Sequence, residues 1–142
     1  MRSLVIDDEF VALNKLVGLL TPFGECDAAT SGCQALEMFC RALKDTCPYR
    51  LVTIDINMPD INGIVLLGRL QQAERAVACI PARKLMVTAA SSESHVLAAA
   101  TGDCDGFLVK PVRRTVLLQK LQALGLVPAA PVTVDEERGA RS

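Results

Sequence analysis

Apolar and polar positions follow two periods along this chain, one typical of buried strands and the other of amphipathic helices. Short, nearly continuous apolar runs predict strands that are buried on both faces. Between these runs, apolar residues recur three and four positions apart, which predicts helices that pack one face inward. The predicted strands are Ser3–Asp7, Cys26–Thr30, Arg50–Asp55, Lys84–Ala89 and Gly106–Lys110.

A helical pattern follows each predicted strand. The second helix begins with the S-x-x-Q sequence of Ser31 and Gln34, a capping-box pattern, and extends to about Leu43. The other helices are predicted at Glu9–Leu20, about Gly63–Ala76, Glu93–Ala100 and Val112–Leu124. The predicted inward residues are Phe10, Leu13, Leu16, Val17 and Leu20 in the first helix, and Val112, Val116, Leu117, Leu121 and Leu124 in the last.

This alternation of strands and helices predicts an α/β fold, with a parallel sheet covered by helices on both faces. The chain of 142 residues has a length that suits one domain with one core. After Leu124 the periodic pattern stops, and two prolines, small residues and mixed charges follow. We therefore expect one domain over residues 1–124 and a flexible C-terminal tail over residues 125–142.

Composition argues against several classes of function. With 15 basic and 16 acidic residues the net charge is −1, so no basic surface is expected to bind nucleic acid. No apolar run is long enough to predict a membrane span, and no targeting sequence is recognised. The six cysteines form no C-x-x-C pair and the chain has one histidine, which does not favour a zinc site. We expect free thiols and a cytoplasmic protein.

Polar residues stand where the apolar strands end. The carboxyl ends of parallel strands meet at one edge of a sheet, where sites form in doubly wound folds. We therefore expect the side chains at four of these ends to converge. They are Asp7 and Asp8 after the first strand, Asp55 at the end of the third, Thr88 in the fourth, and Lys110, followed by Pro111, at the end of the fifth.

Three neighbouring carboxylates destabilise one another unless a cation lies among them. Oxygen ligands without histidine or thiolate favour a hard ion, and Mg²⁺ is the one expected. The ammonium of Lys110 and the hydroxyl of Thr88 suit a phosphoryl group, whose charge is spread over its oxygens. An aspartate can itself be the nucleophile and form an acyl phosphate.

These motifs resemble the receiver domain of the two-component response regulators, over about residues 1–124. The resemblance is carried by Asp7-Asp8, the block DINMPDING from Asp55 to Gly63, Thr88-Ala89 and Lys110-Pro111. It implies a flavodoxin-like sheet with strand order 2-1-3-4-5 and five helices. The chemotaxis regulator that serves as a standard example of this order belongs to the same family.

The resemblance also implies residue roles at the site. Asp55 would accept a phosphoryl group from a phosphohistidine on a sensor histidine kinase. Asp8 would bind Mg²⁺ directly and Asp7 through water, with Asp55 and the backbone carbonyl of Asn57 as further ligands, and Mn²⁺ could replace Mg²⁺. The contacts to the phosphoryl group would come from the Thr88 hydroxyl, the Ala89 backbone N–H and the Lys110 ammonium, and the Lys110-Pro111 peptide is commonly cis in this family.

Phosphorylation is expected to act as a switch. Phe107 occupies the position of the switch aromatic, which moves inward when Thr88 is drawn to the phosphate. The surface made by the fourth helix, fifth strand and fifth helix would then bind a downstream protein. Whether phosphorylation also drives homodimer formation is left open.

Three other readings remain. The domain could be a phosphorelay intermediate that passes its phosphate to a histidine phosphotransfer protein. An aspartyl-phosphate phosphatase would place D-x-D-x-[TV] after the first strand, whereas here the acceptor follows the third strand and reads D-I-N. A flavodoxin would need a phosphate loop rich in Ser, Thr and Gly where this chain has DDEF. We expect a protein that catalyses only its own phosphotransfer and dephosphorylation, rather than an enzyme with a separate substrate.

Overall fold

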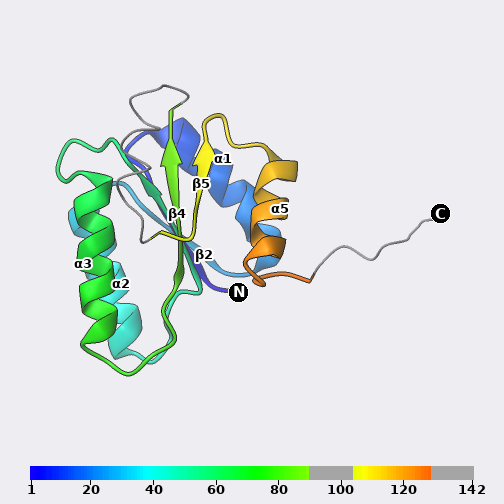
Figure 1. Ribbon diagram of the computed structural model, residues 1–142. Coiled ribbons are helices and arrows are strands. Elements are labelled where there is room, and N and C mark those ends of the chain that lie inside the picture. Colours follow the sequence, from blue (N-terminus) through cyan, green and yellow to red (C-terminus); the bar gives the residue numbers. More distant parts are fainter. Residues whose placement is uncertain (90–103, 129–142) are drawn as a thin grey trace.

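The computed structural model describes residues 1–89 and 104–128. Five strands form one parallel sheet in the order β2-β1-β3-β4-β5 (Figure 1), which confirms the predicted fold class and strand order. The strands are β1 (Ser3–Ile6), β2 (Cys26–Ala29), β3 (Leu51–Asp55), β4 (Arg83–Thr88) and β5 (Gly106–Val109).

Helices cover both faces of the sheet. In the described part of the chain they are α1 (Phe10–Leu20), α2 (Gly32–Lys44), α3 (Gly63–Arg75) and α5 (Arg114–Ala123), with a short 3₁₀ turn η1 (Thr21–Phe23) after α1. Figure 1 shows α2 and α3 on one face and α1 and α5 on the other. The helix predicted at Glu93–Ala100 lies outside the described residues.

Each face of the sheet has its own buried core. Successive residues of a strand point to opposite faces, so Leu4 and Ile6 pack with α2 and α3, while Val5 between them packs with α1 and α5. The three central strands, β1, β3 and β4, are therefore buried on both faces, which explains why they read as nearly continuous apolar runs, whereas the edge strands β2 and β5 are only partly buried.

The start of α2 follows its sequence signal with one difference. The Ser31 hydroxyl accepts a hydrogen bond from the Gln34 N–H at 3.1 Å, as a capping box requires. The Gln34 side chain, however, accepts from the N–H of Thr30 at 2.8 Å, one residue before the cap. The helix start is correctly predicted, and its reciprocal bond is displaced by one residue.

Two residues predicted to face inward are exposed. Phe10 is 71% exposed and Val116 is 40% exposed. Both lie in the first turn of a helix that follows a strand, α1 for Phe10 and α5 for Val116. In α5 the neighbouring Leu117 is buried, and Leu117 and Leu121 rather than Val116 make the contact with the core. In α1 the contact with the core begins at Leu13, about one turn after Phe10.

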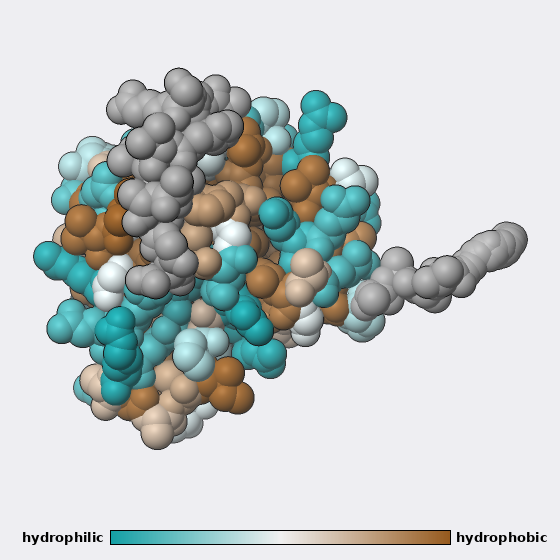
Figure 2. All heavy atoms as spheres, in the orientation of Figure 1, coloured by the Kyte–Doolittle hydropathy of each residue, from teal (hydrophilic) through white to brown (hydrophobic). Residues whose placement is uncertain are grey.

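Contacts with the core continue past the last helix. Leu126 and Val127 pack against the core on the α1 and α5 side, and the Leu126 N–H donates to the Leu121 carbonyl at 3.0 Å. Residues 129–142 of the expected tail lie outside the described residues. On the face drawn in Figure 2, hydrophilic and hydrophobic residues are interspersed over the coloured atoms. Within the described residues, no helix has the length and apolar character needed to cross a bilayer.

Candidate functional site

Three carboxylates meet at the carboxyl edge of the sheet. Asp7 and Asp8 follow β1, and Asp55 ends β3, the strand paired directly with β1. One ligand oxygen from each of the three lies within 4.8 Å of the others. Asp7 and Asp55 are buried, and Asp8 is exposed. The predicted convergence of these three side chains is confirmed.

Lys110 brings one positive charge into this group of acids. Its Nζ lies 2.9 Å from Asp7 Oδ2 and 3.5 Å from Asp55 Oδ2. Its backbone N–H donates to the Thr88 carbonyl at 2.8 Å, so the residue is held where β5 leaves β4. The Lys110-Pro111 peptide is cis, as the resemblance implied.

Glu9 is a fourth acid at this site and is not among the predicted site residues. Its Oε1 lies 3.7 Å from Lys110 Nζ, and its backbone N–H donates to Asp7 Oδ1 at 2.9 Å. The available signal was its place directly after the acidic pair. Because Glu9 is largely exposed, its ion pair with Lys110 is expected to be weak.

The charges at this edge are not balanced. Burial and the nearby charge of Asp7 raise the pKa of Asp55 from 3.8 to about 6, against the opposing effects of Lys110 and of the Asn57 N–H. Burial acts to lower the pKa of Lys110, but its hydrogen bond with Asp7 and the charges of Asp55 and Asp7 together raise it. One ammonium thus faces several carboxylates, and Asp55 resists ionisation.

The loop after Asp55 turns back tightly on the strand. Asp55 Oδ1 accepts the Asn57 N–H at 3.2 Å, and the Gly63 N–H donates to the Ile56 carbonyl at 2.9 Å. A Cβ atom at position 63 would collide with the carbonyl oxygen of Asp55, so this passage from loop to helix needs glycine. Asn57, whose carbonyl is the predicted fourth protein ligand, is exposed two residues after Asp55.

The remaining predicted residues lie on β4 and β5 at the same edge. Thr88 directly follows Val87, the sheet partner of Asp55, and is buried. Its hydroxyl donates to the Ala89 carbonyl at 3.2 Å, and Ala89 itself is exposed. Phe107 pairs with Met86 in the sheet and is half-buried against the core on the α2 and α3 side.

The donor set suits a hard divalent cation. Asp7, Asp8 and Asp55 offer oxygen atoms only, close enough together to share one ion. Burial and the charge of Asp7 raise the pKa of Asp55, and a cation among the carboxylates would offset both effects. The acidic cluster is therefore a candidate divalent-cation site.

The comparison with known families agrees with this geometry. Residues 4–122 match the response regulator receiver domain, and the chain belongs to this family. Acceptance of a phosphoryl group in two-component signalling is general for the family.

Two curated relatives illustrate the range of similar proteins. The chemotaxis protein CheY-3 of Vibrio cholerae is 29% identical over 127 residues, which cover 87% of this chain and 91% of that protein. The regulatory protein VanRB of Enterococcus faecalis is 32% identical over 125 residues, covering 87% of this chain. The chain spans about half of VanRB, 52% of its length.

A solved structure agrees with the fold along most of the chain. The CheX–CheY–BeF3–Mg²⁺ complex from Borrelia burgdorferi contains a chain that superposes with a TM-score of 0.73 and 25% sequence identity. The superposition covers 89% of this chain and 90% of that one.

Proposed function

We propose that this domain accepts a phosphoryl group on Asp55 from a phosphohistidine of a sensor kinase and thereby switches its binding to a partner protein. The observation that supports this most is the convergence of Asp7, Asp8 and Asp55 at one edge of the sheet, where Lys110 pairs with two of the three. A buried carboxylate beside both an acidic cluster and an ammonium suits phosphoryl transfer, in which catalysis is mainly positioning and charge stabilisation.

In the proposed reaction a carboxylate oxygen of Asp55 attacks the phosphorus of the phosphohistidine. An O–P bond forms as the N–P bond breaks, and the electron pair of that bond returns to the imidazole nitrogen. Lys110 Nζ, 3.5 Å from Asp55 Oδ2, is placed to pair with a phosphoryl oxygen. The Thr88 hydroxyl would leave the Ala89 carbonyl to donate to another oxygen, and the Ala89 N–H is proposed as a third donor.

Mg²⁺ is the ion proposed for the acidic cluster, with Mn²⁺ as a substitute. Asp7, Asp8, Asp55 and the carbonyl of Asn57 would hold it, Asp7 through water. When bound, the ion supplies positive charge that offsets the carboxylates and the incoming phosphoryl group. The oxygen-only donor set and the close spacing of the three carboxylates support this choice.

The proposed output is a protein–protein interaction. One structural neighbour is a CheY chain in complex with CheX, and one relative is a chemotaxis protein, which supports a protein partner here as well. Of the surface predicted for this role, β5 and α5 are described, and they expose Val109 and Val116. The helix predicted at Glu93–Ala100 would complete it. In this proposal the domain catalyses only its own phosphotransfer and dephosphorylation and turns over no separate substrate.

A phosphodonor assay tests the acceptor. The protein is incubated with acetyl phosphate and Mg²⁺, and the gain of one phosphoryl group is followed by intact mass. We expect labelling of the native protein, no labelling of Asp55→Asn, and loss of labelling when EDTA removes the ion. Labelling that persists in Asp55→Asn would show that another residue is the acceptor.

The relay alternative needs a second measurement. The phosphorylated domain is mixed with a purified histidine phosphotransfer protein, and movement of the label is followed. Transfer to that protein would favour the relay over the switch. Retention of the label, together with stronger capture of a partner in beryllofluoride, would favour the switch.

A further inference from the structure

The loop between β3 and α3 is tied to α2 at a point away from the acidic cluster. Asp60, in this loop, accepts hydrogen bonds from the Gly32 N–H at 3.2 Å and from the Cys33 N–H at 3.1 Å, one with each carboxylate oxygen. These N–H groups belong to the first turn of α2 and so have no partner within the helix. A side chain 27 residues distant in sequence from Cys33 thus caps the helix.

The loop also fits closely against the start of α2. A Cβ atom at position 32 would collide with Cγ2 of Ile61, so Gly32 allows the loop to lie directly on the helix end. Asp60 itself is exposed, and hydrogen bonds rather than burial hold its side chain. The N–H groups of Cys33 and Gly32 lower the pKa of Asp60, as expected for a carboxylate at a helix N-terminus.

Asp60 lies between the two ends of the loop, each of which is held by a hydrogen bond of its own. Asn57 is fixed to the Asp55 carboxylate at the beginning, and Asn62 caps α3 at the end by accepting the Ile64 N–H at 2.7 Å. Met58 is buried in the core, but an apolar contact does not specify orientation. The paired hydrogen bonds of Asp60 are directional, so they restrict how the middle of the loop, and with it Asn57, can turn.

We propose that Asp60 is a positioning residue, which holds the loop after β3 against α2 and so keeps the Asn57 carbonyl and Asp55 arranged for the divalent ion. The inference rests on the proposed function, since it assigns a role toward that ion. Asp60 touches neither the ion nor the phosphoryl group. Its effect is to limit the conformations of residues that do.

Ser31 provides a matched control on the same helix end. Its hydroxyl caps α2 by accepting the Gln34 N–H, but Ser31 is not part of the acceptor loop. Asp60→Ala and Ser31→Ala both remove a cap from α2 and should destabilise the domain by similar amounts. Only Asp60→Ala also releases the loop after β3 from α2.

The test measures Mg²⁺ affinity by calorimetry and unfolding by urea for the native protein, Asp60→Ala, Asp60→Asn and Ser31→Ala. We expect the Mg²⁺ Kd to rise about fivefold in Asp60→Ala, roughly the effect of one lost hydrogen bond. In Ser31→Ala it should change less than about twofold, because the loop keeps its anchor. Asp60→Asn, which keeps one acceptor oxygen, should lie between the native protein and Asp60→Ala.

Phosphorylation kinetics separate positioning from general damage. For Asp60→Ala, the rate with acetyl phosphate should be lowered at limiting Mg²⁺ and recover at saturating Mg²⁺. If Asp60→Ala and Ser31→Ala show the same Mg²⁺ Kd, Asp60 is a helix cap and nothing more. If the native protein neither binds Mg²⁺ nor becomes phosphorylated, the proposed function fails, and this inference fails with it.

Discussion

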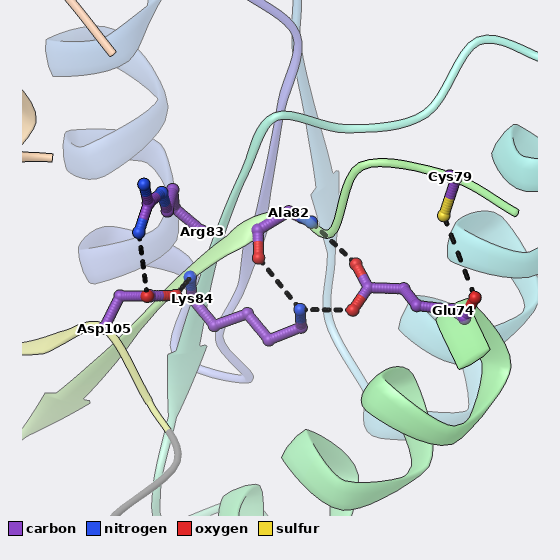
Figure 3. Close-up of polar contacts among 6 residues, drawn as sticks. All are labelled: Glu74, Cys79, Ala82, Arg83, Lys84 and Asp105. Carbon is purple, nitrogen blue, oxygen red and sulfur yellow. Dashed lines mark hydrogen bonds and ion pairs between the residues drawn. The ribbon is translucent and has the colours of Figure 1, made fainter. Parts of the chain in front are cut away.

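Two groups of buried charges lie at opposite edges of the same sheet, and they are built differently. At the amino edge, Glu74 and Lys84 form an ion pair of 2.6 Å with side chains 6% and 4% exposed (Figure 3). The second oxygen of Glu74 accepts the Ala82 N–H at 2.7 Å, and Lys84 Nζ also donates to the Ala82 carbonyl at 2.9 Å. Each charge there has an opposite charge and additional hydrogen bonds.

The neighbouring acid at the amino edge is matched in the same way. Asp105 accepts the backbone N–H of Lys84 at 2.8 Å and pairs with Arg83 at 3.3 Å (Figure 3). At the carboxyl edge, by contrast, Asp7, Asp55 and Glu9 all pair with Lys110. Burial of charge alone therefore does not distinguish the two edges, whereas the lack of a balancing opposite charge coincides with the candidate cation site.

The largest expected effect is at the balanced edge. Glu74→Ala leaves the Lys84 ammonium buried without its carboxylate, so we expect the free energy of unfolding to fall by about 3–5 kcal/mol. Urea unfolding of the native protein and of Glu74→Ala measures this loss of free energy. Replacing both residues, as in Glu74→Leu with Lys84→Met, should restore much of the loss, because no buried charge then remains unpaired. A double variant as unstable as Glu74→Ala would contradict this explanation.

At the unbalanced edge, removal of a charge should have the opposite sign. Asp55→Asn takes away a carboxylate whose pKa burial and Asp7 raise to about 6. We expect the metal-free protein to gain about 1–3 kcal/mol of stability at pH 7, since each unit of pKa shift is worth about 1.4 kcal/mol. Urea unfolding in EDTA is the measurement, with Glu37→Gln as a control that removes an exposed carboxylate on α2, outside the cluster. A destabilised Asp55→Asn would refute the imbalance.

The same raised pKa predicts a pH dependence. Asp55 loses its proton less readily in the folded state than in the unfolded state. In EDTA, Asp55 therefore adds most to the free energy of unfolding at low pH, and this stabilisation is lost as the pH rises from about 4 to about 6. For the same reason protons compete with Mg²⁺ below pH 6. We expect the Mg²⁺ affinity to be about tenfold weaker at pH 5 than at pH 7. An affinity that is constant over this range would contradict the prediction.

The smallest expected effect is at Glu9. Its carboxylate is exposed and 3.7 Å from Lys110, so Glu9→Gln should change stability by less than about 0.5 kcal/mol. Because Lys110 is held more closely by Asp7, its position should also be kept. Thermal unfolding at low and high salt checks this, since any contribution of an exposed pair is screened by salt. A loss comparable to that of Glu74→Ala would mean that Glu9 belongs to a balanced network.

Much of the acidic site could be predicted from strand ends. Asp7, Asp8, Asp55 and Lys110 each follow an apolar run, and in a parallel sheet the ends of such runs meet at one edge. Asp60 could not be found in this way, because it lies in the middle of a loop and its partners belong to another helix. The burial of Lys84 was also missed, since a lysine that begins a strand reads as exposed.

The amino-acid sequence alone predicted the succession of strands and helices along the chain, the burial of the sheet by helices on both faces and the residues at its carboxyl edge. These follow from local periodicity and from the rule that parallel strands end together. Which charges are paired and which are not follows only from the folded arrangement of the chain. Pairing depends on distances of a few ångströms between segments remote in sequence, and neither the spacing nor the composition of the chain contains those distances.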